Sequence, residues 1–181
     1  MYRDDKIKLR GFNKEDASKL VEMRNDFEGV KAFCGSPFPV NLQTEERWIE
    51  SMYPPGLKAS IYFAVEAIDS LSLVGYCVAR QIDYINRNAL VGTLLFEEFR
   101  GKGKFKRISN LFYRYLFNEI NLHKVYTYIL KDNIISLESH KKIGFKVEGE
   151  VREHIYQTGV YKDVCFLSLY SKGFMNVGSD E

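Results

Sequence analysis

The sequence has few cysteines, little net charge and no long apolar run. Its three cysteines, Cys34, Cys77 and Cys165, are widely spaced and form no CxxC pair, which argues against a structural metal and favours reduced, packed thiols. Its 26 basic and 24 acidic residues give a net charge of +2, whereas nucleic-acid-binding proteins usually carry a strong basic excess. No apolar run approaches membrane length and no signal-peptide pattern opens the chain. We therefore expect a cytoplasmic protein with no metal site, no membrane segment and no nucleic-acid partner.

The remaining composition is typical of a folded globular chain. Hydrophobic residues make up 45% of the sequence and aromatic residues 14%, which argues against disorder. A length of 181 residues suits one domain, and no internal repeat or low-complexity tract interrupts it. We expect a single domain over residues 1–175, followed by a flexible tail over residues 176–181.

Apolar periodicity predicts both strands and helices. Runs of branched and aromatic residues favour strands, and apolar residues spaced three or four apart favour amphipathic helices. We expect Trp48 to lie in the core, the strand at 123–130 to be buried on both faces, and Ile134 to point inward. The expected strands cover residues 7–12, 61–67, 73–82, 89–96, 123–130, 145–156 and 160–170. The expected helices begin near Asn13, Thr44, Phe105 and Asn133, with Gly144 in a left-handed cap after the last.

The stretch from Phe96 to Leu116 carries the clearest chemical signal. An apolar run leads into two closely spaced glycines, and an amphipathic helix follows at once. The first turn of a helix leaves N–H groups unpaired at its positive end, which favours a bound anion. Five basic residues at this end would oppose the helix dipole unless phosphates neutralise them, although a solvated basic face beside an ordinary glycine turn is the alternative. They are Arg100, Lys102, Lys104, Lys106 and Arg107.

The spacing of this loop differs from two common phosphate-binding patterns. No Gly-Lys-Ser/Thr closes it, as the Walker pattern requires, and the third glycine of a dinucleotide fingerprint is missing. It resembles the Arg/Gln-x-x-Gly-x-Gly/Ala loop of the GCN5-related N-acetyltransferases (GNAT), which grips the pyrophosphate of acetyl-CoA. Motifs in the second half of the chain resemble the RimJ/RimL-type branch of that family, and the first half resembles it loosely. These motifs are Asn133–Ser136, Lys142–Phe145, Glu148–Glu150 and Tyr161–Val164.

The resemblance implies a fold, a cofactor and a reaction. The implied fold is α/β (α+β): one domain with helices flanking a mixed, mostly antiparallel sheet, whose splayed central strands form an acetyl-CoA cleft. The implied enzyme is an acetyl-CoA-dependent N-acetyltransferase that passes the acetyl group to a primary amine by direct attack. In this family the first two helices and the loop between them form one wall of the acceptor pocket. Analogy with relatives that pair through carboxyl-terminal strands or helices suggests a homodimer.

The resemblance also assigns the contacts to acetyl-CoA. Backbone groups near Leu94, Leu95 and Phe96 would pair with the pantetheine arm and the acetyl carbonyl. Asn133 would hydrogen-bond the cofactor arm; its position alone predicts a helix cap, and the two roles are compatible. The residues expected to take the pyrophosphate are Arg100, Gly101, Lys102, Gly103, Lys104 and Phe105.

Two residues depart from the family pattern. Phe105 stands where the family usually has Gly or Ala, so its ring must turn toward the core for its amide to stay available. His140 occupies the position of the tyrosine that protonates the departing thiolate. An imidazolium could serve as that acid, because the ordinary pKa of histidine is about 6.5. The alternatives are a surface histidine and direct protonation by solvent.

The general base and the amine acceptor stay open. An α-amine with a pKa of about 8 needs less help from a base than an amine with a pKa of about 10. The acceptors considered are peptide amino termini, amino sugars and other small amines. A polyamine is less favoured because residues 33–40 contain no carboxylate, although Glu45, Glu46 and Glu50 follow. The candidate bases are Glu66, Asp83, Glu97, Glu153, His154 and Asp163.

Two other classes of function fit parts of the sequence. A non-catalytic acyl-CoA sensor on the same scaffold would explain the departures at Phe105 and His140, because fold alone does not establish activity. An RNA-contacting protein would use the basic residues 100–107, and the near-neutral net charge weighs against it.

Overall fold

A seven-stranded mixed sheet forms the centre of the protein. The computed structural model describes residues 2–26, 38–52, 58–101 and 103–177. Strand order is β1-β2-β3-β4-β5-β7-β6, and every neighbouring pair is antiparallel except β4 and β5. The predicted fold class, a single α/β domain with a mixed, mostly antiparallel sheet, is confirmed. The strands are β1 (Ile7–Arg10), β2 (Ile61–Ala67), β3 (Leu73–Asp83), β4 (Asn88–Leu95), β5 (Lys124–Leu130), β6 (Lys146–Gln157) and β7 (Val160–Tyr170).

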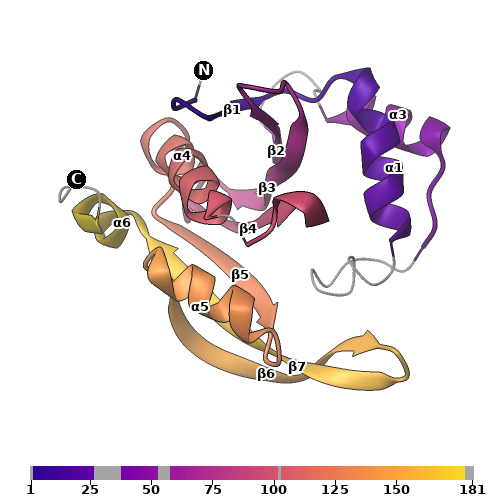
Figure 1. Cartoon of the computed structure of the whole chain (residues 1–181). Coiled ribbons are helices and arrows are strands. Elements are labelled where there is room, and N and C mark those ends of the chain that lie inside the picture. Colours follow the sequence, from indigo (N-terminus) through magenta and orange to yellow (C-terminus); the bar gives the residue numbers. More distant parts are fainter. Residues whose placement is uncertain (1, 27–37, 53–57, 102, 178–181) are drawn as a thin grey trace.

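Helices cover the two faces of the sheet unequally. On one face, here called the α4 face, lie α4 (Lys104–Asn118), α5 (Ile134–Lys142) and α6 (Ser171–Val177) (Figure 1). On the other, the α1 face, α1 (Ala17–Asn25) and α3 (Leu42–Ser51) lie together beside β2 and β3. Two short 3-10 turns, η1 (Lys14–Asp16) and η2 (Glu97–Phe99), precede α1 and follow β4. None of the helices that the structure describes is long and apolar enough to cross a membrane.

Each face has its own hydrophobic cluster. Under α4, the fully buried Ile108, Phe112 and Leu116 pack on alternate residues of the sheet, at the spacing that predicted this helix. On the α1 face a smaller cluster joins Leu20 and Ile49 to Leu94. Because side chains alternate across a strand, β4 contributes to both clusters and links the two sides of the molecule.

Most predicted elements are confirmed, and the burial of two of them differs from the prediction. Strand β5 is not buried on both faces: Tyr128 is 37% exposed, because no described helix covers the α1 face of β5 and β7. Ile134 is 59% exposed, and α5 packs instead through Leu137 and His140. Helix α6 ends at Val177 and residues 178–181 lie outside the described residues, so the tail over residues 176–181 stays a prediction.

The predicted turns have the expected backbone. The β6–β7 hairpin turns at Thr158 and Gly159, whose φ angles of 49° and 86° are those of a tight hairpin turn. Gly144 has φ of 101°, as predicted for the residue after α5. Cys77 and Cys165 are free and buried, as expected of packed thiols, and Cys34 lies outside the described residues.

Candidate active site

The parallel strands β4 and β5 pair only at their beginnings. Their register covers Asn88–Leu90 and Lys124–Tyr126, after which β4 follows β3 to Leu95 and β5 follows β7 to Leu130. The N–H of Phe96 donates to the carbonyl of Val74 at 3.0 Å, so Phe96 faces β3. By alternation, the backbone groups of Leu95 and Thr93 face the side where β5 has diverged. Residues 94–96 were predicted to contact acetyl-CoA through their backbone groups. Of these three residues, only Leu95 has its backbone groups on the diverging side, and Thr93 has them there too.

Close packing against β3 fixes the end of β4. A Cβ atom built on Gly75 would lie 2.0 Å from the carbonyl oxygen of Leu94 and 2.9 Å from the Cα of Leu95. Only glycine permits this approach, so Gly75 sets where the diverging edge of β4 lies. The role of Gly75 could not be predicted from the sequence, since a glycine within a strand pattern shows a close approach only after its partner is known.

The glycine turn, residues 100–104, joins the end of β4 to α4. Gly101 and Gly103 have φ angles of 72° and 69°, in the left-handed region that glycine adopts readily. A Cβ at either would meet nothing within 4 Å, so backbone conformation rather than crowding requires glycine here. Gly103 precedes α4 and has no side chain to cap the first-turn N–H groups, which fits an anion at this end of the helix. Lys102 lies outside the described residues.

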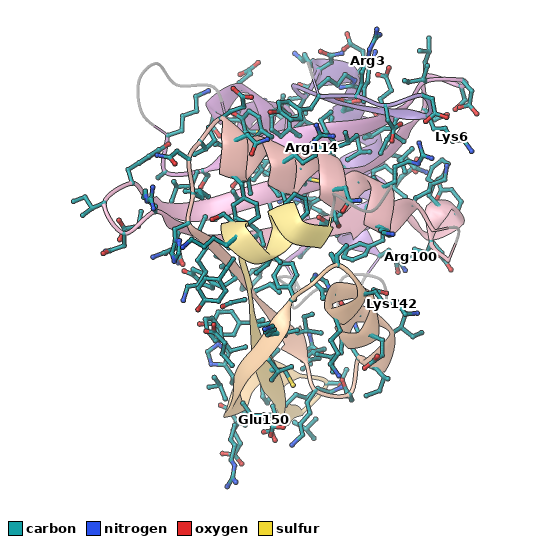
Figure 2. All side chains as sticks on the ribbon, turned by 90° about the vertical axis from the view of Figure 1, so that its left-hand side faces the viewer. Arg3, Lys6, Arg100, Arg114, Lys142 and Glu150 are labelled. Carbon is teal, nitrogen blue, oxygen red and sulfur yellow. The ribbon has the colours of Figure 1, made fainter. Side chains whose placement is uncertain are left out.

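The described basic residues around this turn have different partners. The Nε of Arg100 donates to the carbonyl of Leu95 at 3.0 Å and thereby ties the turn to the end of β4. Lys104 Nζ lies 5.5 Å from the centre of the Phe99 ring. Arg107 instead pairs with Asp4 at 2.8 Å and with Asp5, whose hydrogen bond raises the pKa of Arg107. Figure 2 shows Arg100 and Lys142 on one side of the molecule in that view.

Phe105 and His140 contact one another between α4 and α5. The Phe105 ring packs against the α4-face core, as predicted, with its centre 4.8 Å from that of His140. His140 is 7% exposed and also contacts Phe145, so the surface-histidine alternative is wrong. Its Nδ1 lies 2.8 Å from the carbonyl of Ser136, which assigns the proton of the neutral ring to Nδ1. Burial lowers the pKa of His140, against the raising effect of that hydrogen bond, and favours the neutral ring.

Asn133 is the N-cap of α5, as its position predicted. Its Oδ1 accepts a hydrogen bond from the N–H of Ser136 at 3.1 Å. The cap fixes Asn133 at the point where β5, having left β4, turns into α5. The contact with the cofactor arm stays a prediction.

The α1 face carries a buried carboxylate beside an aromatic ring. Glu45 on α3 is 0% exposed, and burial raises its pKa. Arg24 Nη1 lies 3.3 Å from Glu45 Oε1, and the guanidinium carbon lies 4.1 Å from the centre of the Trp48 ring. Trp48 is half-buried rather than enclosed in the core. Glu45 could be singled out from the sequence. Its contact with Arg24 could not, because that contact joins two separate helices.

The family model described as acetyltransferase (GNAT) domain matches residues 6–146. The chain belongs to the GNAT acetyltransferase family. This GNAT protein is therefore an acetyl-CoA-dependent N-acetyltransferase, as the glycine turn and the motifs after it predicted. The divergence of β4 and β5 lies inside the matched region, and so do the glycine turn and His140.

Relatives of this GNAT protein match it over nearly their full length. The spermidine N(1)-acetyltransferase of Escherichia coli K12 is 22% identical over 93% of this chain and 88% of its own. The SPbeta prophage-derived uncharacterized N-acetyltransferase YokL of Bacillus subtilis is 31% identical over 91% of this chain and 90% of its own. The structure of spermidine N-acetyltransferase from Vibrio cholerae in complex with CoA and spermine shares the fold, with a TM-score of 0.88 and 23% identity. It aligns with 96% of this chain and 100% of its own.

Several candidate bases of this GNAT protein have structural partners. Glu66 pairs with Lys8 at 2.6 Å and also with Arg10. Asp83 accepts hydrogen bonds from the N–H groups of residues 85 and 86 in the turn before β4. Asp163 accepts from the N–H of Glu153 at 2.9 Å. These bonds give three of the six candidates a role in the fold and leave the base unassigned.

Among the residues that the structure describes, no three His, Cys, Asp or Glu side chains gather into a metal-binding group.

Proposed function

We propose that this GNAT protein acetylates a primary amine of a small polyamine. The divergence of β4 and β5 supports the acetyl transfer, because acetyl-CoA would reach the end of β4 from the α4 side and the amine from the α1 side. The polyamine class rests on the spermidine acetyltransferases that align with nearly the whole chain. Acetyl-CoA supplies an activated thioester. The amine nitrogen attacks its carbonyl carbon, the C–S bond breaks, the thiolate takes up a proton, and the attacking nitrogen loses one.

The chain holds the donor through backbone groups and cations. First-turn N–H groups of α4, with Arg100, Lys102 and Lys104, would bind the pyrophosphate, since a helix amino terminus favours negative charge. The outward backbone groups of Thr93 and Leu95 would pair with the pantetheine arm and the acetyl carbonyl, and Asn133 would bind the arm from the other strand. Fixing the thioester at the end of β4 lowers the entropic cost of the reaction.

The relatives change the balance among the acceptors. The absence of carboxylates in residues 33–40 argued against a polyamine. Residues 33–37 lie outside the described residues, so the structure does not show what this stretch contacts. Two relatives that align almost end to end are described as spermidine acetyltransferases. The buried Glu45 also places one carboxylate on the α1 side. A peptide amino terminus is the second candidate, because the motifs in residues 133–164 favour the RimJ/RimL-type branch.

Proton transfer to the thiolate has two candidate sources. His140 can donate only as the imidazolium, because the Nδ1 proton of the neutral ring is bound to Ser136. Burial makes that form scarce near neutral pH, so solvent is the competing donor. A thiolate with a pKa of about 8.5 leaves without much assistance.

The test is CoA release from acetyl-CoA with spermidine, a peptide with a free amino terminus and a nucleotide-linked amino sugar. Acetyl-CoA binding is measured on the same sample. We expect turnover with spermidine at the highest kcat/KM of the three. Higher kcat/KM with the peptide or the sugar would overturn the polyamine assignment. Tight acetyl-CoA binding without turnover of any amine would favour the sensor alternative.

A further inference from the structure

On the α1 face, an arginine of the protein itself lies where a cationic ligand could bind. The Arg24 guanidinium stacks on Trp48, with its carbon 4.1 Å from the ring centre, and lies beside the fully buried Glu45. A carboxylate beside an aromatic face is the combination that binds organic cations. Arg24 belongs to the last turn of α1, whereas Glu45 and Trp48 belong to α3.

A second arginine on the same side shows how a structural ion pair is built in this protein. Arg10 donates from Nη1 and Nη2 to the two oxygens of Asp16, at 2.7 and 2.9 Å, in the bidentate geometry that guanidinium and carboxylate prefer. Arg24 makes one longer contact of 3.3 Å with Glu45, and neither Glu45 oxygen accepts a hydrogen bond from the residues that the structure describes. The buried carboxylate thus keeps capacity for a donor that Arg24 does not satisfy.

A series of aromatic contacts connects the Arg24 position to the end of β4. Trp48 contacts Tyr62 and Phe12, with ring centres 5.3 and 6.0 Å apart, and Phe12 contacts Tyr76. Tyr76 on β3 pairs directly with Leu94 on β4, and all these residues belong to the α1-face cluster. One residue beyond Leu94, the backbone of Leu95 faces the diverging edge. The aromatic residues around Arg24 thus belong to the same cluster as the end of β4, where the amine would have to arrive.

We propose that Glu45 and Trp48 form a subsite for a second positive charge of the acceptor, and that Arg24 occupies this subsite until the acceptor displaces it. The inference rests on the proposed amine acceptor. The Arg24 side chain is 31% exposed, so it can turn toward solvent without movement of α1. An internal occupant reduces the apparent affinity for a competing cation to the intrinsic affinity multiplied by the fraction of time that the subsite is free. The enzyme would thus prefer acceptors with two charges, of which one replaces Arg24 and the other loses its proton before attack.

The test compares two amines of equal length, 1,5-diaminopentane and n-hexylamine, which differ by one terminal charge. Trp48 is the only tryptophan of the chain, so its fluorescence reports on the subsite independently of turnover. In the full-length protein we expect a saturable fluorescence change with the diamine. Arg24→Met keeps the apolar stem and removes the charge, so the variant should bind the diamine about tenfold more tightly. Binding of n-hexylamine should change less than about twofold.

Further variants separate displacement from a purely structural ion pair. Glu45→Gln should abolish the preference for the diamine, and the double variant Arg24→Met/Glu45→Gln should lack it while leaving no unpaired charge. Arg47→Met and Glu50→Gln, at exposed positions of α3, are the matched controls and should leave both amines unaffected. Thermal unfolding of each variant identifies any that fail to fold.

Two results would overturn the inference: equal effects of Arg24→Met on both amines, or no effect of the diamine on Trp48 in either protein. A saturable Trp48 response to the diamine without acetyl transfer to any amine would instead overturn the proposed function and leave the subsite in place.

Discussion

The two faces of the sheet differ in where the residues proposed to bind their ligands lie in the sequence. On the α4 face the features that favour acetyl-CoA come from consecutive residues: the end of β4, the glycine turn and the first turn of α4. On the α1 face the features proposed for the amine come from distant segments, since Arg24 on α1 meets Glu45 and Trp48 on α3 only after folding. In the proposed site, donor recognition would thus be mainly a property of local backbone, and acceptor recognition a property of side chains that share a cluster.

Gly75→Ala gives the largest expected effect. It tests whether the donor side depends on a residue that is distant in the sequence. The added methyl group would overlap the carbonyl of Leu94 and push the end of β4 away from β3. We expect acetyl-CoA affinity to fall at least about tenfold and the free energy of unfolding to fall by about 1–3 kcal/mol. Calorimetric titration and urea unfolding measure the two quantities.

Gly173→Ala is the control for that change. Gly173 lies in α6, where a Cβ would meet nothing within 4 Å, so alanine should stabilise the fold by about 0.5–1 kcal/mol and leave binding unchanged. Unchanged acetyl-CoA affinity in Gly75→Ala would show that the end of β4 is not the donor site.

Gly103→Glu tests the local character of the donor side. Both Gly103 and Gly159 have positive φ and open surroundings, so a glutamate at either should cost about 1–2 kcal/mol of folding free energy. Only Gly103→Glu adds a negative charge at the amino terminus of α4, and it should weaken acetyl-CoA binding by more than about tenfold. Equal affinities of the Gly103→Glu and Gly159→Glu proteins would remove the glycine turn from the site. Equilibrium dialysis measures the acetyl-CoA affinity of both variants.

The sequence predicted the donor side far better than the acceptor side. Gly101, Gly103 and Asn133 act on neighbours along the chain, so spacing alone indicated their turn and cap roles, and periodicity gave the core orientation of Phe105. Gly75 could not be found in this way, because its partner Leu94 lies on another strand. The exposure of Tyr128 was missed for a related reason: a continuous apolar run gives no sign of which face lacks a covering helix. The Arg24–Glu45 contact likewise depends on how α1 and α3 pack.

His140→Phe has a smaller expected effect that depends on pH. If His140 protonates the thiolate, only its imidazolium does so, and burial lowers the pKa below its ordinary value. The ratio of wild-type to variant kcat should therefore be under about threefold at pH 8 and rise toward pH 6, with acetyl-CoA affinity unchanged. A ratio that does not vary with pH would retire His140 as the acid.

The same residue gives a second, independent readout in stability. Because the pKa of His140 is lower in the folded than in the unfolded state, its stabilising contribution is present at high pH. That contribution is lost as the pH falls through the ordinary histidine range, where unfolding takes up a proton. The acid side of the wild-type stability profile should be steeper than that of the His140→Phe protein, as urea unfolding would show. Parallel profiles would contradict a buried neutral ring.

Lys104→Gln and Arg107→Gln give the smallest expected effects and define the edge of the donor site. Lys104 begins α4 beside the glycine turn, whereas Arg107 is already paired with Asp4 and Asp5. We expect Lys104→Gln to weaken acetyl-CoA binding about two- to fivefold, less so at high salt, and Arg107→Gln to leave it unchanged. A larger loss of acetyl-CoA affinity in Arg107→Gln than in Lys104→Gln would show that Arg107, and not Lys104, binds the phosphates.

The divergence of β4 and β5 also constrains the kinetics. If acetyl-CoA and the amine approach the end of β4 from opposite faces, as proposed, they can be bound together, so neither must leave before the other enters. No acetylated form of the enzyme needs to accumulate, and double-reciprocal plots of initial rate against either substrate should intersect instead of running parallel. The divergence of two neighbouring strands in one sheet therefore favours a ternary complex of enzyme, acetyl-CoA and amine.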